Sequence, residues 1–405
     1  MSIRVAFATN VISPYRVPLY AALGQTPDWE FKLFSCCELE FDRQWMPVVD
    51  PPFATKKSFN ISYKRLRKHS GEVSFVNRNQ VHIPLGLWFD LWRFRPDVVI
   101  SNEMGARSLI ACIYAFIAGK SFVLWSYVTP HSERDISWKQ RSLRKIILRM
   151  THTIVGMGSE ARRYLSSMAI PDEDIFDAPN SIEFSFRPDE LSSGKRSAFR
   201  EQLGISGLCY LYVGGIVPRK GISELLDAWE IFTKDQDVEV SLLMVGDGTE
   251  KKDLMRKVAK REIRKVIFVP FVQPDELPAI YYAADVLIFP TLEDVWGLVV
   301  NEAMTFGLPV ICSKYAGCAA DIVVEDRNGW FVDPNDQVDM VRSLRRAWDA
   351  RDRKGAMAKE GQALIARLSI HNMAEGFRRA VKYSQPQSRC RLKGRGLVNP
   401  DIPRE

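Results

Sequence analysis

Residues 289–304 have the sequence FPTLEDVWGLVVNEAM, and this order of residue types indicates a parallel α/β fold. The stretch continues an apolar run, 286–289, that is typical of a buried strand and ends at a Pro-Thr break. A helix is predicted next, and it stops at Gly307-Leu308-Pro309 because glycine and proline end helices. A loop and a helix start that follow a parallel strand lie at the sheet edge where open α/β folds bind ligands.

Two acids with seven residues between them, Asp294 and Glu302, flank the start of this predicted helix. An ionised carboxylate at such a position accepts hydrogen bonds from hydroxyl groups of a ligand. An acid in the first turns of a helix can instead offset the helix dipole, and this alternative stays open for Glu302.

The segment WGLVVNEAM, residues 296–304, followed by GLPVI, resembles the donor-site signature of retaining, nucleotide-sugar-dependent glycosyltransferases of family 4, glycosyl transferases group 1. The similarity covers most of residues 205 to 345. It includes the segments 213–221, 245–248, 315–321 and 328–331. The resemblance implies an α/β protein with the GT-B fold, in which two Rossmann-like, doubly wound parallel-sheet domains face each other across a cleft.

Strand and helix patterns alternate along the chain, and this alternation begins once in each half, which favours two parallel sheets. Expected strands are 5–8, 31–34, 98–100, 122–125 and 153–155, then 208–213, 240–245, 266–269, 286–289, 310–312 and 330–332. We therefore expect an acceptor-side domain at 1–188 and a nucleotide-sugar domain at 189–370, joined by a linker at 189–197. By the resemblance, a helix at 371–383 crosses back to the first domain, and we expect the polar tail 384–405 to be disordered.

Composition is ordinary for a globular protein of 405 residues, with 46% hydrophobic and 26% charged residues. The seven cysteines form no Cys-x-x-Cys pair, which predicts a reduced cytoplasmic protein without structural zinc. The start of the chain lacks the features of a signal peptide. The longest apolar window, 109–118, is shorter than the ~20 residues that cross a bilayer. No metal and no cofactor beyond the substrate are expected.

The formal net charge of +7 is concentrated in residues 56–69 and 138–150. In the second stretch, apolar residues recur at helical spacing between cations, as in helices that lie on anionic membranes. The predicted membrane-contacting cations are Lys139, Arg141, Lys145 and Arg149. The alternative is a solvated helix that packs its apolar side on its own domain. Nucleic acid is not an expected partner.

The chemistry implied by the resemblance requires a cation beside the departing diphosphate. Lys220 and Arg219 follow the first strand of the second half, so we predict that they neutralise this charge. Family members commonly carry an arginine where this chain has Gly215, and Arg219 would replace it. The alternative is a pair of exposed turn cations.

The resemblance assigns Glu302 to the ribose hydroxyls of the donor and Asp294, or the adjacent Glu293, to the transferred sugar. Phe271 and Val272 resemble the turn that contacts the nucleobase.

Backbone groups of Trp296, Gly297 and Leu298 would line the pyrophosphate, since glycine permits close approach. The Trp296 side chain could equally be plain core.

On the acceptor side, Pro14, Tyr15 and Arg16 follow the first strand, where relatives have a glycine-rich loop. Arg16 would face phosphates or an anionic acceptor. His131 lies near the position of the family's active-site histidine, and it would position or deprotonate the acceptor. A purely structural histidine is the alternative.

Two Asp-x-Asp stretches, 172–174 and 235–237, are predicted to be solvated turns that lead into strands. Two other functions remain open at this point. One is a nucleotide-sugar isomerase of the same fold, and the other is a non-catalytic nucleotide-sugar-binding or membrane scaffold protein.

Overall fold

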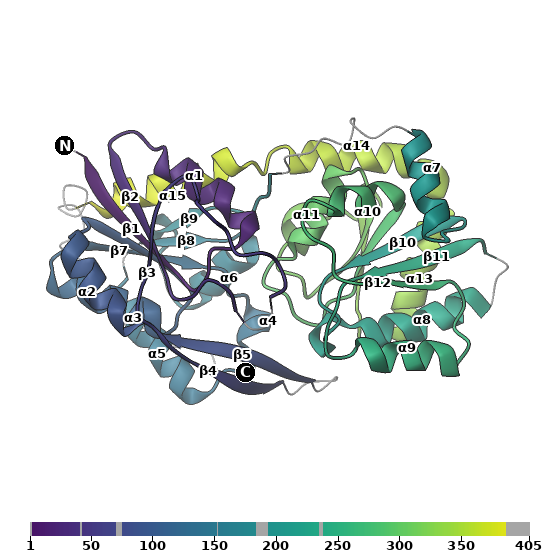
Figure 1. The fold of residues 1–405 in the computed structure, drawn as a ribbon, viewed down its shortest axis with the longest axis horizontal. Helices are drawn as coiled ribbons and strands as arrows, with labels where there is room; N and C mark the ends of the chain where they lie inside the picture. Colours follow the sequence, from purple (N-terminus) through teal and green to yellow (C-terminus); the bar gives the residue numbers. More distant parts are fainter. Residues whose placement is uncertain are drawn as a thin grey trace. The chain divides into compact units, whose positions relative to one another are not determined.

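The computed structural model describes residues 2–40, 43–69, 75–151, 153–183, 193–234 and 238–385. Contacts divide the chain into two compact units. The first unit comprises Met1–Arg67, Arg78–Glu183 and Leu368–Glu405, and the second comprises Lys68–Asn77 and Phe184–Arg367. Each unit contains a parallel sheet with helices on both faces (Figure 1).

The first unit is built on a seven-stranded sheet with the order β3-β2-β1-β6-β7-β8-β9. Every neighbouring pair in it is parallel. The strands are β1 (Ile3–Thr9), β2 (Trp29–Ser35), β3 (Ala54–Lys57), β6 (Val98–Asn102), β7 (Ser121–Ser126), β8 (Ile154–Gly156) and β9 (Ile175–Asp177). Strands β4 (Ile61–His69) and β5 (Phe75–Ile83) form a separate two-stranded sheet. The chain reverses its direction of winding between β1 and β6.

Helices cover both faces of the first sheet, with α2, α3 and α5 on one face and α1 and α15 on the other (Figure 1). The helices are η1 (Pro14–Arg16), α1 (Val17–Gly24), α2 (Leu85–Phe94), α3 (Ala106–Ile117), α4 (Pro130–Glu133), α5 (Trp138–Arg149), α6 (Ser159–Ser167), η2 (Asp172–Asp174) and α15 (Ile370–Ser384). Helix α15 packs on α1, β7 and β9 of this unit, and Phe377 lies 5.2 Å from the Trp125 ring.

The second unit has a six-stranded parallel sheet with the order β12-β11-β10-β13-β14-β15. Its strands are β10 (Leu208–Val213), β11 (Val240–Val245), β12 (Val266–Val269), β13 (Val286–Phe289), β14 (Val310–Ser313) and β15 (Gly329–Val332). Its helices are α7 (Ser193–Gln202), η4 (Pro218–Lys220), α8 (Ile222–Lys234), α9 (Lys251–Lys260), α10 (Leu277–Ala283), α11 (Leu298–Thr305), α12 (Ala319–Ile322), α13 (Gln337–Asp349), η5 (Arg351–Arg353) and α14 (Lys354–Ile365). The winding reverses between β10 and β13.

Buried aromatic side chains fill the space between this sheet and α8. Tyr210 and Trp229 are fully buried, and their rings lie 5.2 Å apart in an edge-to-face arrangement. Their polar atoms are satisfied, because the Tyr210 hydroxyl donates to the Leu344 carbonyl and the Trp229 indole donates to the Arg264 carbonyl. Such partners offset the cost of burying the polar atoms of these aromatic side chains.

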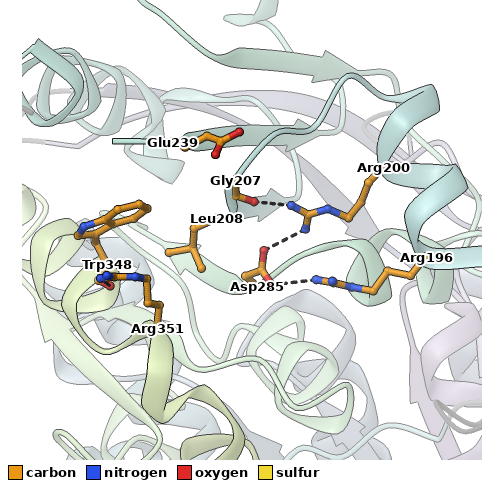
Figure 2. A pocket seen from close by; sticks show the side chains of 8 residues that line it. All are labelled: Arg196, Arg200, Gly207, Leu208, Glu239, Asp285, Trp348 and Arg351. Carbon is orange, nitrogen blue, oxygen red and sulfur yellow. Dashed lines mark hydrogen bonds and ion pairs between the residues drawn. The ribbon is translucent and has the colours of Figure 1, made fainter. Parts of the chain in front are cut away.

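A buried carboxylate, Asp285, ties α7 to the amino edge of the sheet (Figure 2). Its oxygens accept hydrogen bonds from Arg196 at 2.8 Å, from Arg200 at 2.9 Å and from the Cys209 amide at 2.9 Å, and Lys354 is a third cationic partner. The two arginines also donate to carbonyls at the end of α10. A pocket of about 420 Å³ lies beside this network. Because the pocket is at the amino edge, it is not the place where a doubly wound sheet binds its ligands.

The predicted α/β class with two doubly wound parallel sheets is confirmed. The apolar runs of the second half form β10 to β13 at the predicted bounds. The sequence analysis missed β3, β4, β5 and β9, and it placed no strand in the basic stretch 56–69, which contributes to β3 and β4. These segments are polar, short or at a sheet edge, so they lack the apolar run or alternation used to find strands.

Candidate functional site

The candidate site of the second unit lies where the loops after β10 and β13 meet, at the carboxyl edge of the sheet. The Arg219 carbonyl accepts hydrogen bonds from the Leu292 amide at 2.9 Å and the Thr291 hydroxyl at 3.1 Å. Gly221 follows at a φ of +65°, and a Cβ there would lie 2.1 Å from the Pro290 carbonyl oxygen. Only glycine therefore fits between these two loops.

Lys220 and Asp294 form a buried ion pair at this junction. The Lys220 ammonium donates to Asp294 Oδ2, and the Trp296 amide donates to Asp294 Oδ1 at 3.1 Å. Burial alone would raise the pKa of Asp294, but Lys220 and Arg219 outweigh it and hold the pKa below its usual value. The loops thus keep an ionised carboxylate and a cation in fixed contact.

Arg219 lies beside the same pair. Its guanidinium donates to the Glu293 carbonyl oxygen at 3.1 Å and approaches Asp294 to 3.9 Å. Of the two adjacent acids, the structure therefore brings the Asp294 carboxylate to the cations. Gly215 is exposed in the loop after β10, and its carbonyl accepts from the Tyr212 hydroxyl at 2.8 Å.

The start of α11 brings the backbone of residues 296–298 to the same edge. Gly297 has a φ of +99°, and a Cβ there would lie 2.5 Å from the Phe289 ring. The Trp296 side chain is 2% exposed and its indole donates to Asn301 at 2.9 Å, so this side chain belongs to the core. Leu298 is the first residue of α11 and is half-buried.

Glu302 lies in the second turn of α11 and accepts a hydrogen bond from the Tyr281 hydroxyl. Burial raises the pKa of Glu302 above its ordinary value, and burial together with the Glu302 carboxylate raises the pKa of Tyr281 well above its own. The Tyr281 ring stacks on Phe306 at 5.5 Å, which fixes the hydroxyl that orients Glu302. Phe271 and Val272 follow β12 at this edge and are half-buried.

In the first unit, the predicted residues after β1 form the short helix η1. Pro14 is half-buried and Tyr15 is exposed. The Arg16 guanidinium lies 4.4 Å from the Trp125 ring centroid and donates to the Asn180 side chain at 2.6 Å. Burial lowers the pKa of Arg16. Arg16 is thus bound within its own unit.

His131 lies in α4, a short helix capped by the Thr129 side chain. It is half-buried, and its Nδ1 is 3.2 Å from the Arg134 guanidinium.

The sequence analysis missed a polar cluster at the carboxyl edge of the first sheet. Asn10, Asn102, Glu103, Arg107 and Tyr127 form it, and we call it the edge cluster. Asn102 and Glu103 come two and three residues after the apolar run 98–100, and this position after a strand is the signal that could have revealed them.

Helix α5 buries apolar residues on one side and displays cations together with two large apolar residues on the other. Ile147 and Leu148 are buried in the core of the first unit, whereas Trp138 is 73% and Ile146 48% exposed. The predicted cations Lys139 and Arg149 are exposed, and Arg141 and Lys145 are half-buried. Among the residues described, no helix has the length and apolar character needed to span a bilayer.

The Asp-x-Asp stretch at 172–174 forms η2, and Arg162 pairs with Asp172 at 3.1 Å and with Asp177 at 2.9 Å. It is a polar turn, as predicted, and it leads into β9, a strand that the sequence analysis missed. The stretch 235–237 and most of the tail 384–405 lie outside the described residues. Within the described ranges no group of metal-ligating side chains is found, and the cysteines there form no disulfide.

Comparisons with known proteins agree with this fold. The structure of HepE from Anabaena in complex with UDP superposes with a TM-score of 0.73 and 16% identity, over 94% of this chain and all of that one. This similarity places the protein in the GT-B fold class. Residues 196–364 match the model of the family glycosyl transferases group 1, so the chain carries a domain of that family.

Curated relatives are similar in sequence over part of their length. The sulfoquinovosyl transferase of Arabidopsis thaliana is 33% identical over 282 residues, which are 67% of this chain and 53% of the relative. The O-antigen chain mannosyltransferase B of Escherichia coli is 31% identical over 128 residues, 31% of this chain and 33% of the relative. The chain thus matches between a third and about half of the length of these relatives.

Proposed function

We propose that this protein is a retaining glycosyltransferase of family 4 that moves a hexose from a nucleotide sugar to a hydroxyl group of a glycan or lipid-linked acceptor. The observation that carries the proposal is the buried Lys220–Asp294 pair, with Arg219 beside it, at the winding reversal of the second sheet. This is the position where open α/β sheets bind ligands. The complex of HepE with UDP-glucose supports a nucleotide-sugar donor.

In this mechanism the donor's glycosidic bond to phosphate breaks and the sugar binds the acceptor oxygen on the same face. The acceptor proton passes to the departing phosphate. Lys220 and Arg219 stabilise the negative charge that develops on the phosphate oxygens, so the reaction needs no metal or cofactor. Glu302 binds the ribose hydroxyls, and Asp294 binds the transferred sugar while holding Lys220 in place. Phe271 and Val272 contact the base, and His131 positions the acceptor.

Donor binding is tested by thermal-shift measurements with a panel of nucleotide sugars. A nucleotide sugar that binds the folded state raises the unfolding midpoint, with a gain in stability of about 2.7 kcal/mol at a hundred times its Kd. Glu302→Ala is expected to remove most of this shift, because the ribose loses its carboxylate. Glu276→Ala, a change of an exposed acid in the same unit, is the matched control and should keep the shift. A panel without any shift for the wild type would contradict the proposal.

We further propose that the protein acts at the cytoplasmic face of a membrane in the assembly of surface polysaccharide or glycolipid. The exposed side of α5 supports this, because Trp138 and Ile146 lie among cations there. Similarity to the O-antigen mannosyltransferase of Escherichia coli favours such an acceptor.

Changing Arg141, Lys145 and Arg149 together to glutamine is expected to weaken binding to vesicles that contain phosphatidylglycerol. Each cation near an anionic surface contributes about 1 kcal/mol, so the loss should exceed tenfold. Co-sedimentation at low salt measures it. The control changes three cations of α9, Lys252, Arg256 and Lys260, to glutamine, which lowers the net charge equally. Equal binding of the two variants would count against a specific role of α5.

A further inference from the structure

The edge cluster lies where the first sheet reverses its winding, at the carboxyl ends of β1, β6 and β7. It is therefore at the position in the first unit that corresponds to the candidate donor site in the second. Its central group is the Glu103 carboxylate. The Tyr127 hydroxyl donates to Glu103 Oε1, and the Asn10 side-chain amide donates to Glu103 Oε2 at 3.2 Å.

A buried arginine holds this cluster together. Arg107 is 4% exposed, and its guanidinium donates to the side-chain oxygens of Asn10 and Asn102 and to the Asn102 carbonyl. It also lies 3.8 Å from Glu103. Since its N–H groups are turned to these partners, Arg107 orients the two amides and the acid rather than facing solvent.

Glu103 has a backbone conformation that a glutamate rarely adopts. Its φ is +63°, in the left-handed region, where a side chain costs free energy that glycine would avoid. Such strain persists where several contacts with the surrounding structure hold the residue in its conformation, and strained residues cluster at functional sites. Here the Glu103 amide donates to the Trp125 carbonyl at 3.2 Å and its carbonyl accepts from the Ser108 hydroxyl, which fixes the turn.

The carboxylate is held firmly and still has capacity for a ligand. The Glu103 side chain is 44% exposed. Each carboxylate oxygen can accept two hydrogen bonds, so Asn10 and Tyr127 leave one position on each oxygen. Burial and the adjacent Glu103 charge raise the pKa of Tyr127 well above its ordinary value, which keeps this phenol a donor.

We propose that the Glu103 carboxylate binds the acceptor by accepting hydrogen bonds from two hydroxyl groups of the acceptor. The part of the acceptor that contacts Glu103 is then an uncharged polyol, such as a sugar or cyclitol ring. The inference rests on the proposed transfer function. The two arginines that act on Tyr127 are committed to other protein groups: Arg107 to the edge cluster, and Arg16 to Trp125 and Asn180. A phosphate on the acceptor ring would meet the Glu103 carboxylate and be repelled. In this proposal the acceptor is selected by its hydroxyls at Glu103, whereas the prediction that Arg16 faces phosphates or an anionic acceptor stays a prediction.

The test uses two glutamates with the same backbone strain. Glu103→Gly removes the carboxylate and places a glycine, which tolerates a positive φ, at this position. Glu262→Gly makes the same change at an exposed turn of the second unit, where φ is +52°. We measure release of nucleoside diphosphate from the donor found by thermal shift. Methyl α-glucoside, methyl α-mannoside, myo-inositol and their monophosphates are the acceptor probes.

The wild type and Glu262→Gly are expected to release nucleotide faster with at least one neutral probe than with its monophosphate. Glu103→Gly should lose this stimulation at least 100-fold, with an unchanged thermal shift by the donor, which shows that the protein is still folded. Glu103→Gln, which keeps the shape, should raise the acceptor KM at least tenfold and leave the donor KM unchanged. If Glu103 had a purely structural role, Glu103→Gln would not raise the acceptor KM while leaving the donor KM unchanged.

Three results would overturn the inference and leave donor binding intact: full stimulation in Glu103→Gly, a preference of the wild type for a phosphorylated probe, or no stimulation by any neutral probe. Absence of both a donor shift and nucleotide release in the wild type is a different outcome. It would remove the proposed function and this inference together.

Discussion

Lys220→Ala is expected to reduce transfer by about 10²–10³-fold, the effect of removing one preorganised group that stabilises transition-state charge. The ammonium is held beside Asp294 at the carboxyl edge of the second sheet, so it costs no reorganisation when the phosphate departs. Nucleoside diphosphate release under saturating donor measures the effect on kcat.

Because Lys220 is buried, its removal leaves the Asp294 carboxylate without its closest cation and will also lower stability. The unfolding midpoint is therefore measured alongside activity. Lys251→Ala is the matched control, since Lys251 is also poorly exposed and pairs with Asp247 at 3.4 Å in the loop after β11. Activity of a folded Lys220→Ala protein within about threefold of the wild type would refute the role given to this lysine, since a transition-state contact should cost far more.

Asp285→Ala is expected to destabilise the second unit by about 3–5 kcal/mol, the cost of leaving buried charges without a partner. Arg196 and Arg200 converge on this carboxylate (Figure 2). Lys354 also pairs with it, and the Cys209 amide of β10 donates to it. Hydrogen exchange of the β10 and β13 amides under native conditions measures this loss of stability within the second unit. Asp253→Ala, which removes an exposed acid paired with Arg256, is the control and should cost less than about 1 kcal/mol.

The Asp285 effect should also depend on pH in a defined direction. Burial would raise the pKa of Asp285, but Lys354, the Cys209 amide and Arg196 outweigh burial and lower the pKa in the folded state. A lowered pKa gives stability that is present above the unfolded value of about 3.9 and is lost as the pH falls through the folded value. The difference between wild type and Asp285→Ala should therefore be constant from pH 5 to 7 and shrink below about pH 4. A difference that grows on acidification would show that the carboxylate is not the group responsible.

The sheet of the second unit could be predicted from sequence because its central strands are buried on both faces and appear as continuous apolar runs, such as 240–245 and 286–289. The polar edge strand β3, with the sequence ATKK, carries no such signal. In the candidate site, the spacing of acids identified the loop after β13 and the start of α11, but the choice between Glu293 and Asp294 depends on how residues 290–294 turn back over Arg219. No sequence pattern gives that turn.

The edge cluster shows a second reason why some site residues could not be predicted from the sequence. Arg107 lies on α3 and Asn10 follows β1, so their contact depends on the order of β1 and β6 in the sheet. The positive φ of Glu103 is likewise a property of the folded turn. Arg16 was predicted from its place after β1, but its stacking on Trp125 needs the neighbouring strand β7. Residues that are distant in the chain are brought together here by topology alone.

No side chain fits at Gly221, and this limits where substitutions can change the donor preference of the protein. Since even a methyl group would collide with the Pro290 carbonyl, the backbone that carries Lys220 and the backbone that carries Asp294 must move as one body. In the proposed mechanism Lys220 neutralises the departing phosphate, whereas Phe271 and Val272 follow β12 in a separate, half-buried turn. We therefore expect substitutions at 271–272 to change donor preference with less effect on bond cleavage than substitutions at Lys220 or Asp294.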